Sequence, residues 1–192
     1  MKLNCKKSKY MIFNFTKNYK MSTRLKLEDN LLEEVSETRL LGVILDNQLS
    51  WQSNTSFIVK KAYKRMSILH KLYEFDVPRN DLLEIYILYI RSVLESSATV
   101  WHSSVTQGQE NELERVQKVA LRIILKEDYL DYASALEMCS LITLKDRRTN
   151  LCKLFAKSCT KSEKTKWMFP LKENNQSLRN PEKYQVYPAF TS

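Results

Sequence analysis

Glycine and proline are scarce in this sequence, which limits the number of tight turns that the chain can form. Its 192 residues include two glycines, Gly42 and Gly108, and four prolines. Hairpin turns draw heavily on glycine, so this scarcity argues against a barrel or sandwich built from many hairpins. It favours helices joined by a small number of connections.

Paired cysteines and long apolar runs are also missing. The four cysteines are Cys5, Cys139, Cys152 and Cys159. None has C-x-x-C spacing and no secretory apolar segment follows Met1, so we expect reduced thiols in an intracellular protein of the cytoplasm or nucleus. The most apolar window, residues 82–94, contains Glu84 and Arg91. It is shorter than the ~18 consecutive apolar residues that a membrane helix needs, so we expect no membrane partner.

The usual catalytic and metal-binding patterns are absent from the sequence. No Asp-Asp pair ends a strand, as two-metal nucleotidyl transfer needs, and two glycines cannot supply a phosphate-binding loop. Cys152 and Cys159 would lie about 10 Å apart along a helix, which is too far for two ligands of one zinc ion. His70 and His102 have no second ligand at a suitable spacing. We therefore assign no catalytic residue, metal ligand or cofactor, and expect no enzyme activity from this chain alone.

The net charge of +9 is unevenly distributed. Residues 1–26 contain eight Lys/Arg and no acid, residues 144–192 contain eleven Lys/Arg and four acids, and the stretch between them is acidic. Basic ends around an acidic middle favour contact with a polyanion at the ends. The alternative is that the lysines keep the protein soluble and bind nothing.

The first 48 residues show strand patterns. Tyr10–Phe15 is rich in aromatic and β-branched residues and predicts a strand, and residues 24–27 and 31–35 predict a hairpin, or alternatively a short helix through 31–37. Arg39–Leu45 predicts another strand, in which Gly42 marks a bend or a close approach of the backbone.

Helical periodicity begins after Ser50, a predicted N-cap. One apolar face consists of Ile58, Ala62, Met66, Leu69 and Tyr73, and a basic ridge beside it consists of Lys60, Lys61, Lys64 and Arg65. After the break at Asp76–Pro78, a second apolar face consists of Leu83, Tyr86, Ile90, Val93, Ser97 and Trp101. The short connection predicts that these two helices pack as an antiparallel pair.

Three further helices and a tail complete the prediction. After a polar loop at residues 106–108, a helix should bury Leu113, Val116, Ala120, Ile123 and Ile124. Its charged residues should lie mostly outside: Glu112, Glu114, Arg115, Lys118 and Arg122. A shorter helix is expected at Tyr132–Cys139. Thr143 and Asp146 should start a last helix, with a face of Leu144, Arg147, Leu151, Leu154, Phe155 and Ser158. The predicted fold class is α+β and mostly α: a β-rich part at 1–48, a bundle of four to five helices at 49–160, and a loosely ordered basic tail at 161–192.

Several segments resemble one family. Asn4, Lys7-Ser8-Lys9 and YMIFN, followed by LLGVILDNQLSW, are similar to the end of the palm in reverse transcriptases of non-LTR retrotransposons. The thumb and following region of the same enzymes are similar to three later segments of this sequence: L-x-x-I-Y-x-x-Y-I-x-S-V-L, VW and LERVQKVALRIIL. The resemblance implies nucleic-acid contacts at Lys7, Lys9, Leu41 and Gly42. Because the catalytic Asp-Asp turn would precede Met1, it implies a remnant that cannot polymerise alone.

A second resemblance covers about residues 40–101, which are similar to an N-terminal segment of the AlkB-homologue tRNA methyltransferase and oxygenase. Three hypotheses follow. The favoured one is a polymerase remnant with weak nucleic-acid affinity, RNA or DNA, through its basic ends. The second is a helical protein-interaction module. The third is an RNA-modification enzyme or its accessory, and methyl transfer to tRNA or 2-oxoglutarate turnover by the purified chain would support it. Apolar faces left by a missing palm would favour self-association.

Overall fold

The computed structural model describes residues 4, 8–15, 24–27 and 30–168 of the chain. These belong to two compact units, Met1–Phe57 and Ile58–Ser192, and the boundary between them falls within the first long helix. Lys7, the turn at residues 28–29 and the tail beyond residue 168 lie outside the described residues. The predicted division into 1–48, 49–160 and 161–192 stays a prediction.

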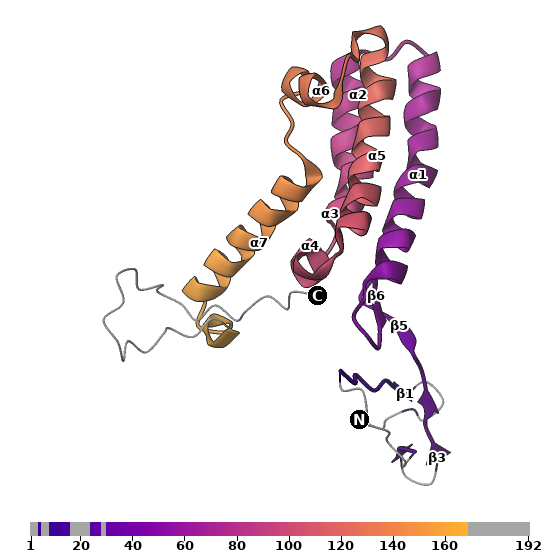
Figure 1. The fold of residues 1–192 in the computed structure, drawn as a ribbon, viewed down its shortest axis with the longest axis vertical. Coiled ribbons are helices and arrows are strands. Elements are labelled where there is room, and N and C mark those ends of the chain that lie inside the picture. The colour runs from indigo at the N-terminus through magenta and orange to yellow at the C-terminus, as the bar shows by residue number, and fades with distance from the viewer. Residues whose placement is uncertain (1–3, 5–7, 16–23, 28–29, 169–192) are drawn as a thin grey trace, which may run out of the picture. The chain divides into compact units, whose positions relative to one another are not determined.

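The described part of the N-terminal unit contains three two-stranded sheets (Figure 1). The strands are β1 (Lys9–Tyr10), β2 (Lys26–Leu27), β3 (Asn30–Leu31), β4 (Glu33–Glu34), β5 (Glu37–Leu40) and β6 (Val43–Asp46). β2 and β3 form the predicted hairpin, whereas β1 and β4 pair in parallel. The strand predicted over Tyr10–Phe15 was wrong beyond Tyr10: residues 11–15 pair with no described strand, and Phe15 is 72% exposed.

The segment Arg39–Leu45 is a hairpin and not the single strand that its apolar run predicts. β5 and β6 pair with Leu40 opposite Val43, so Leu41 and Gly42 form a two-residue turn. Both turn residues have positive φ, 48° and 91°, which two-residue hairpin turns of this hand require. Gly42 reaches this conformation without strain, and its neighbour Leu41 lies at the exposed tip.

Asp46 organises the start of the first helix. Its carboxylate accepts hydrogen bonds from the amides of Gln48 and Ser50 at 3.0 Å and of Trp51 at 3.2 Å. Burial alone would raise the pKa of Asp46, but these hydrogen bonds outweigh it and lower the pKa. Ser50, the predicted N-cap, accepts from the amide of Gln52 at 3.4 Å and also donates to Asp46, so Asp46 shares the capping role.

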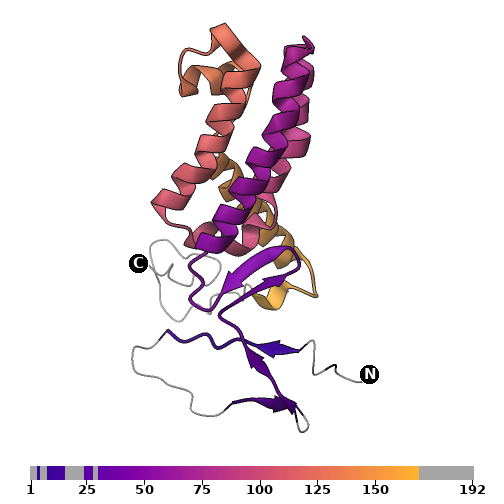
Figure 2. The same ribbon diagram turned by 90° about the vertical axis from the view of Figure 1, so that its right-hand side faces the viewer.

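The rest of the described chain is helical, which confirms the predicted fold class. The elements are α1 (Gln52–Glu74), α2 (Arg79–Ile85), the π-helix η2 (Tyr86–Arg91), α3 (Ser92–Glu95), α4 (Ala98–Trp101), η3 (His102–Ser104), α5 (Gln107–Leu125), η4 (Lys126–Asp128), α6 (Tyr132–Met138), α7 (Leu144–Lys161) and η5 (Lys166–Met168). Figures 1 and 2 show α1, the α2–α3 segment and α5 running alongside one another, with α1 antiparallel to α2 as predicted.

The core lies between these helices and matches much of the predicted pattern. The predicted face of α1 is buried at Ile58, Ala62, Met66 and Leu69, whereas Tyr73 at its end is only partly buried. The polar Asn54 and Thr55 of the same helix are buried as well. On the following segment Tyr86, Ile90, Val93 and Trp101 are buried, but Leu82 takes the place predicted for Leu83. Ser97 was predicted on the buried face and is exposed; its φ of 53° ends the helix there.

The π-helix η2 explains part of this difference. A π-helix widens the turn, so the residues that follow it no longer keep the spacing of an α-helix. After η2, Leu94 and Ala98 are buried, and neither belongs to the predicted face. A pattern that assumes 3.6 residues per turn does not foresee such a shift.

A capping box starts α5 inside the segment predicted as a loop. The Thr106 side chain accepts from the amide of Gln109, whose side chain accepts from the amide of Thr106 at 2.7 Å. Helix therefore begins at Gln107. The predicted stripe on α5 is buried except for Ile123, which is partly exposed.

Candidate nucleic-acid interface

The exposed side of α1 carries most of the predicted basic ridge. Lys60, Lys61 and Lys64 are exposed, and none of them forms an ion pair with an acid of the described residues. Lys60, Lys64 and the exposed Lys71 fall within about 40° around the helix and span about 16 Å along it. We call these three residues the α1 lysine stripe. They form a cationic edge, in which Lys64 and Lys71 lie about two turns apart.

Arg65, the fourth residue of the predicted ridge, is engaged inside the bundle. Its guanidinium lies 4.2 Å from the ring centroid of Tyr89 and donates a hydrogen bond to the Tyr89 carbonyl. Tyr89 belongs to η2, so Arg65 ties α1 to the neighbouring helix. Its charge is less accessible to a ligand than the charges of the lysine stripe.

A second basic edge lies on α7. Lys153, Lys157 and Lys161 are exposed and follow one another at intervals of four residues; we call them the α7 lysine stripe. Leu154 and Phe155 are 64% and 43% exposed, so their predicted place in the core was wrong. The buried positions of α7 are Leu144, Arg148 and Cys159. The apolar residues that were expected inside thus accompany the lysines on the surface.

Buried charges hold α7 in this orientation. Arg148 is fully buried and its Nη2 lies 2.5 Å from Oε2 of Glu110. Glu110 also lies 3.2 Å from Nδ1 of His102, whose Nε2 is 3.0 Å from the hydroxyl of Thr149. Burial alone would raise the pKa of Glu110, but the hydrogen bond to His102 and the charge of Arg148 outweigh it and lower the pKa.

Two more acids bind the start of α7. Glu95 of α3 accepts from Nε of Arg147 at 3.0 Å and lies 3.3 Å from Nε of Arg91. Both oxygens of Glu114 lie 3.1 Å from the amide of Leu144, where the positive end of the α7 dipole favours a carboxylate. Helix α7 is therefore attached through polar groups as much as through apolar packing.

A chain of hydrogen bonds extends this attachment into the core. The buried Tyr86 hydroxyl donates to Gln117 at 2.6 Å, and Gln117 donates to the Tyr132 hydroxyl at 2.9 Å and to the carbonyl of Ile142 at 3.0 Å. Tyr132 in turn donates to Glu114. Burial raises the pKa of Tyr86 and Tyr132, so both phenols stay protonated at neutral pH.

Sequence reasoning missed these acids, although a signal was present. Glu114 had been predicted on the outside of its helix. Glu110 and Gln117 follow the same spacing of three and four residues as the buried Leu113, Ala120 and Ile124, which places them on the core side. Polar residues at such positions indicate buried partners elsewhere in the chain.

The residues implied by the polymerase resemblance have different environments. Lys7 lies outside the described residues. Lys9 forms an ion pair with Glu33 at 2.9 Å, so its charge is partly satisfied. Leu41 and Gly42 form an exposed turn, and the space beside the Gly42 backbone is open. The accessibility of this turn is compatible with a backbone contact to a ligand.

Two of the described cysteines are weak nucleophiles. Cys139, Cys152 and Cys159 are free thiols, and burial raises the pKa of Cys139 and Cys152, which weakens them as nucleophiles. Across the described ranges, no three His, Cys, Asp or Glu side chains gather as metal ligands, and no helix is long and apolar enough to cross a membrane. No protein-family model, curated protein or solved structure matches this chain.

Proposed function

We propose that this chain is a non-catalytic nucleic-acid-binding protein, a remnant of a retrotransposon polymerase, that contacts phosphates through its two lysine stripes. The observation that carries the proposal is the accessibility of the stripes: their lysines are exposed and lack acid partners among the described residues. Lysines in this state can neutralise phosphates and release counterions, which gives a sequence-independent affinity.

The charge of the helices supports the proposal. α1 carries five basic residues and one acid, and α7 carries six basic residues and one acid. Three acids of the bundle are engaged at the start of α7, where Glu95 pairs with Arg147, Glu110 pairs with Arg148 and Glu114 accepts from the Leu144 amide. These three acids therefore do not pair with the lysines of the stripes.

The salt dependence of binding tests this proposal. Fluorescence anisotropy with a labelled RNA or DNA should show an affinity that falls steeply between about 50 and 200 mM salt. Replacing Lys60, Lys64 and Lys71 together by Gln should reduce the slope of log affinity against log salt by about 2 to 3. An affinity that ignores salt, or no binding at low salt, would refute the proposal.

A control with the same change in net charge separates the stripe from general electrostatics. Arg79 already faces an acid, Asp128. Arg79→Gln and Lys64→Gln each remove one positive charge, the first from this ion pair and the second from the α1 lysine stripe. Lys64→Gln should lower the slope by about 0.7 to 0.9, and Arg79→Gln should lower it by less. Equal effects of the two variants would show that only total charge matters.

A protein-interaction module is the second candidate, and one observation favours it. Leu154 and Phe155 expose large apolar surfaces beside the α7 lysine stripe. Exposed apolar patches commonly mark protein contacts, including self-association. Sedimentation velocity over a range of concentrations should detect association that the variant Leu154→Ser with Phe155→Ser abolishes. A wild-type protein that stays monomeric would remove the support for self-association.

A further inference from the structure

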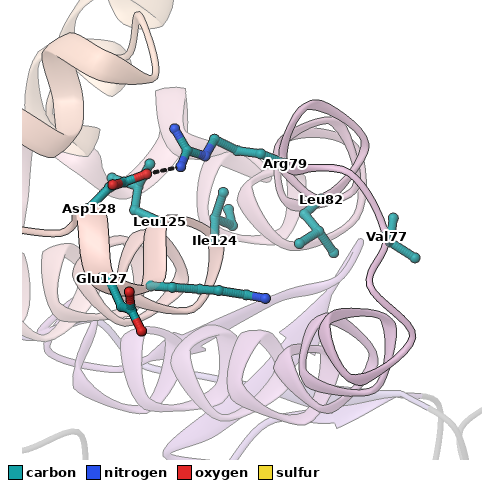
Figure 3. Close-up of a pocket in the computed structure, with 8 residues that line it drawn as sticks. Val77, Arg79, Leu82, Ile124, Leu125, Glu127 and Asp128 are labelled. Carbon is teal, nitrogen blue, oxygen red and sulfur yellow. Dashed lines mark hydrogen bonds and ion pairs between the residues drawn. The ribbon is translucent and has the colours of Figure 1, made fainter.

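Two hollows lie near the end of α5, and the charges of their lining residues differ. One lies between α1 and α5, has a volume of about 370 Å³, and is lined by His70, Tyr73, Val119, Arg122 and Ile123. The other has a volume of about 390 Å³ and lies beside η4 (Figure 3). Both volumes fall in the range of small-ligand sites. Lys126 lines the second hollow and also covers Tyr73 of the first.

The second hollow is poorly suited to an anion. Figure 3 shows Arg79 paired with Asp128, with Leu82 and Ile124 nearby. Glu127 lies on the same lining and opposes the charge of Lys126. Acids and bases are thus balanced around this hollow. The α1–α5 hollow has no acid in its lining, whereas Arg122 and His70 lie on it. A negatively charged ligand would therefore favour the α1–α5 hollow.

The cations beside the α1–α5 hollow rest on aromatic rings. The ammonium of Lys126 lies 4.0 Å from the ring centroid of Tyr73, and the guanidinium of Arg122 lies 5.3 Å from that of Tyr129. Neither cation has an acid partner among the described residues. Exposed cation–π contacts are weaker than charge-assisted hydrogen bonds to phosphate. A phosphate can therefore draw Lys126 away from Tyr73.

The backbone at Lys126 is held in a conformation that side chains rarely adopt. Its φ and ψ are 54° and −120°, which a glycine would tolerate far better. The same residue ends α5 and donates its amide to the carbonyl of Arg122. Strained residues persist where the surrounding structure fixes them, and they concentrate at ligand sites. Here the strained residue is the one whose side chain covers the ring.

We propose that the α1–α5 hollow receives a base of single-stranded nucleic acid. The base stacks on Tyr73 above the apolar floor of Val119 and Ile123, and Lys126 and Arg122 contact the adjoining phosphates. Stacking on an aromatic ring beside cations is a general means of holding single strands, whereas the bases of a duplex are already stacked and paired. This inference rests on the proposed function and adds a preference for single strands.

The test compares a single strand of about ten nucleotides with a duplex of equal length, a size within the usual range for one binding module. Tyr73→Leu keeps an apolar side chain but removes the ring. It should weaken single-strand binding about tenfold and leave duplex binding unchanged. Tyr63→Leu is the matched control, because Tyr63 is an exposed tyrosine of the same helix that does not line the hollow. It should change neither affinity.

Lys126→Gln supplies a second variant that keeps the ring. It should lower the salt slope for the single strand by about 0.7, the contribution of one phosphate contact. A single strand containing 2-aminopurine should also lose fluorescence on binding the wild-type protein, because stacking quenches that base. This measurement needs no variant, so it decides the question even if Tyr73→Leu fails to fold.

The outcomes separate this inference from the proposed function. If neither single strand nor duplex binds, the proposed function fails and the base site with it. If both bind but Tyr73→Leu behaves like Tyr63→Leu, the base site is refuted while phosphate binding by the lysine stripes stands. Unchanged 2-aminopurine fluorescence at saturation would also refute the base site.

Discussion

The buried ion pair between α5 and α7 makes a specific prediction about stability. Glu110→Gln removes the carboxylate charge that faces Arg148, whose side chain is fully buried. Its Nη1 already has no hydrogen-bond partner. Leaving a buried cation without its acid costs about 3 to 5 kcal/mol. Since small domains unfold with about 5 to 15 kcal/mol, the variant should lose a large part of its stability.

Urea unfolding followed by far-ultraviolet circular dichroism measures this loss. With a slope of about 2 kcal/mol per molar urea, the midpoint should fall by about 1.5 to 2.5 M. Glu112→Gln is the matched control, because Glu112 is exposed on the same helix and should change stability by less than about 0.5 kcal/mol. Both variants remove one negative charge from α5.

A double variant identifies the cause of the loss. Glu110→Gln combined with Arg148→Met removes both charges, so no uncompensated cation remains inside the protein. The double variant should be more stable than Glu110→Gln alone, with a coupling of about 2 kcal/mol or more. Additive losses in the cycle, or a Glu110→Gln variant as stable as Glu112→Gln, would refute the reasoning.

Three further predictions concern pH, strain and capping. The pKa of Glu110 is lower in the fold than in the unfolded chain, so the stabilisation by its carboxylate is present above about pH 4.3 and is lost as pH falls through the folded pKa. Acid unfolding of Glu110→Gln should therefore depend less on pH than acid unfolding of the wild type. Identical pH profiles of the two proteins would contradict this. Lys126→Gly should raise the free energy of unfolding by about 1 kcal/mol, because glycine adopts the positive φ without strain. Thermal melting measures the change. A lower melting temperature would show that the contact of Lys126 with Tyr73 outweighs the strain. Thr106→Ala should lower the free energy of unfolding by about 1 kcal/mol, because it removes the cap of α5. Urea unfolding measures this loss, with Ser103→Ala as the control. Equal midpoints for the two variants would contradict a capping role.

The long helices could be predicted from the sequence because their core is apolar and periodic. The faces of α1 and of most of α5 follow spacings of three and four residues, and burial of those side chains dominates the local choice of structure. The sequence pattern could not distinguish a hairpin turn at Leu41–Gly42 from a bend in a single strand, because either structure would place Gly42 where the backbone departs from a regular strand. The burial of Leu94 and Ala98 after η2 was missed, because a wider turn leaves no mark in the hydrophobic pattern.

The orientation of α7 was hidden for a different reason. Leu154 and Phe155 suggested an apolar face, yet the helix buries Arg148 because three acids on distant parts of the chain meet its start. Burial of a charge is favourable only with a partner at the right distance, and that partner is set by the tertiary fold. The exposed face, and with it the α7 lysine stripe, follows from this one arrangement.

Most arginines of the helical unit are engaged within the fold. Five of them contact groups of the fold: Arg65 meets Tyr89, Arg79 meets Asp128, Arg91 and Arg147 meet Glu95, and Arg148 meets Glu110. The planar guanidinium suits such buried or bidentate contacts, whereas the compact, hydrated ammonium suits an exposed edge. The six lysines of the two stripes are exposed. Apart from Arg122 at the α1–α5 hollow, the charge that can meet a phosphate in the proposed sites is therefore carried by lysine, and total basic content overstates it wherever an arginine is already engaged within the fold.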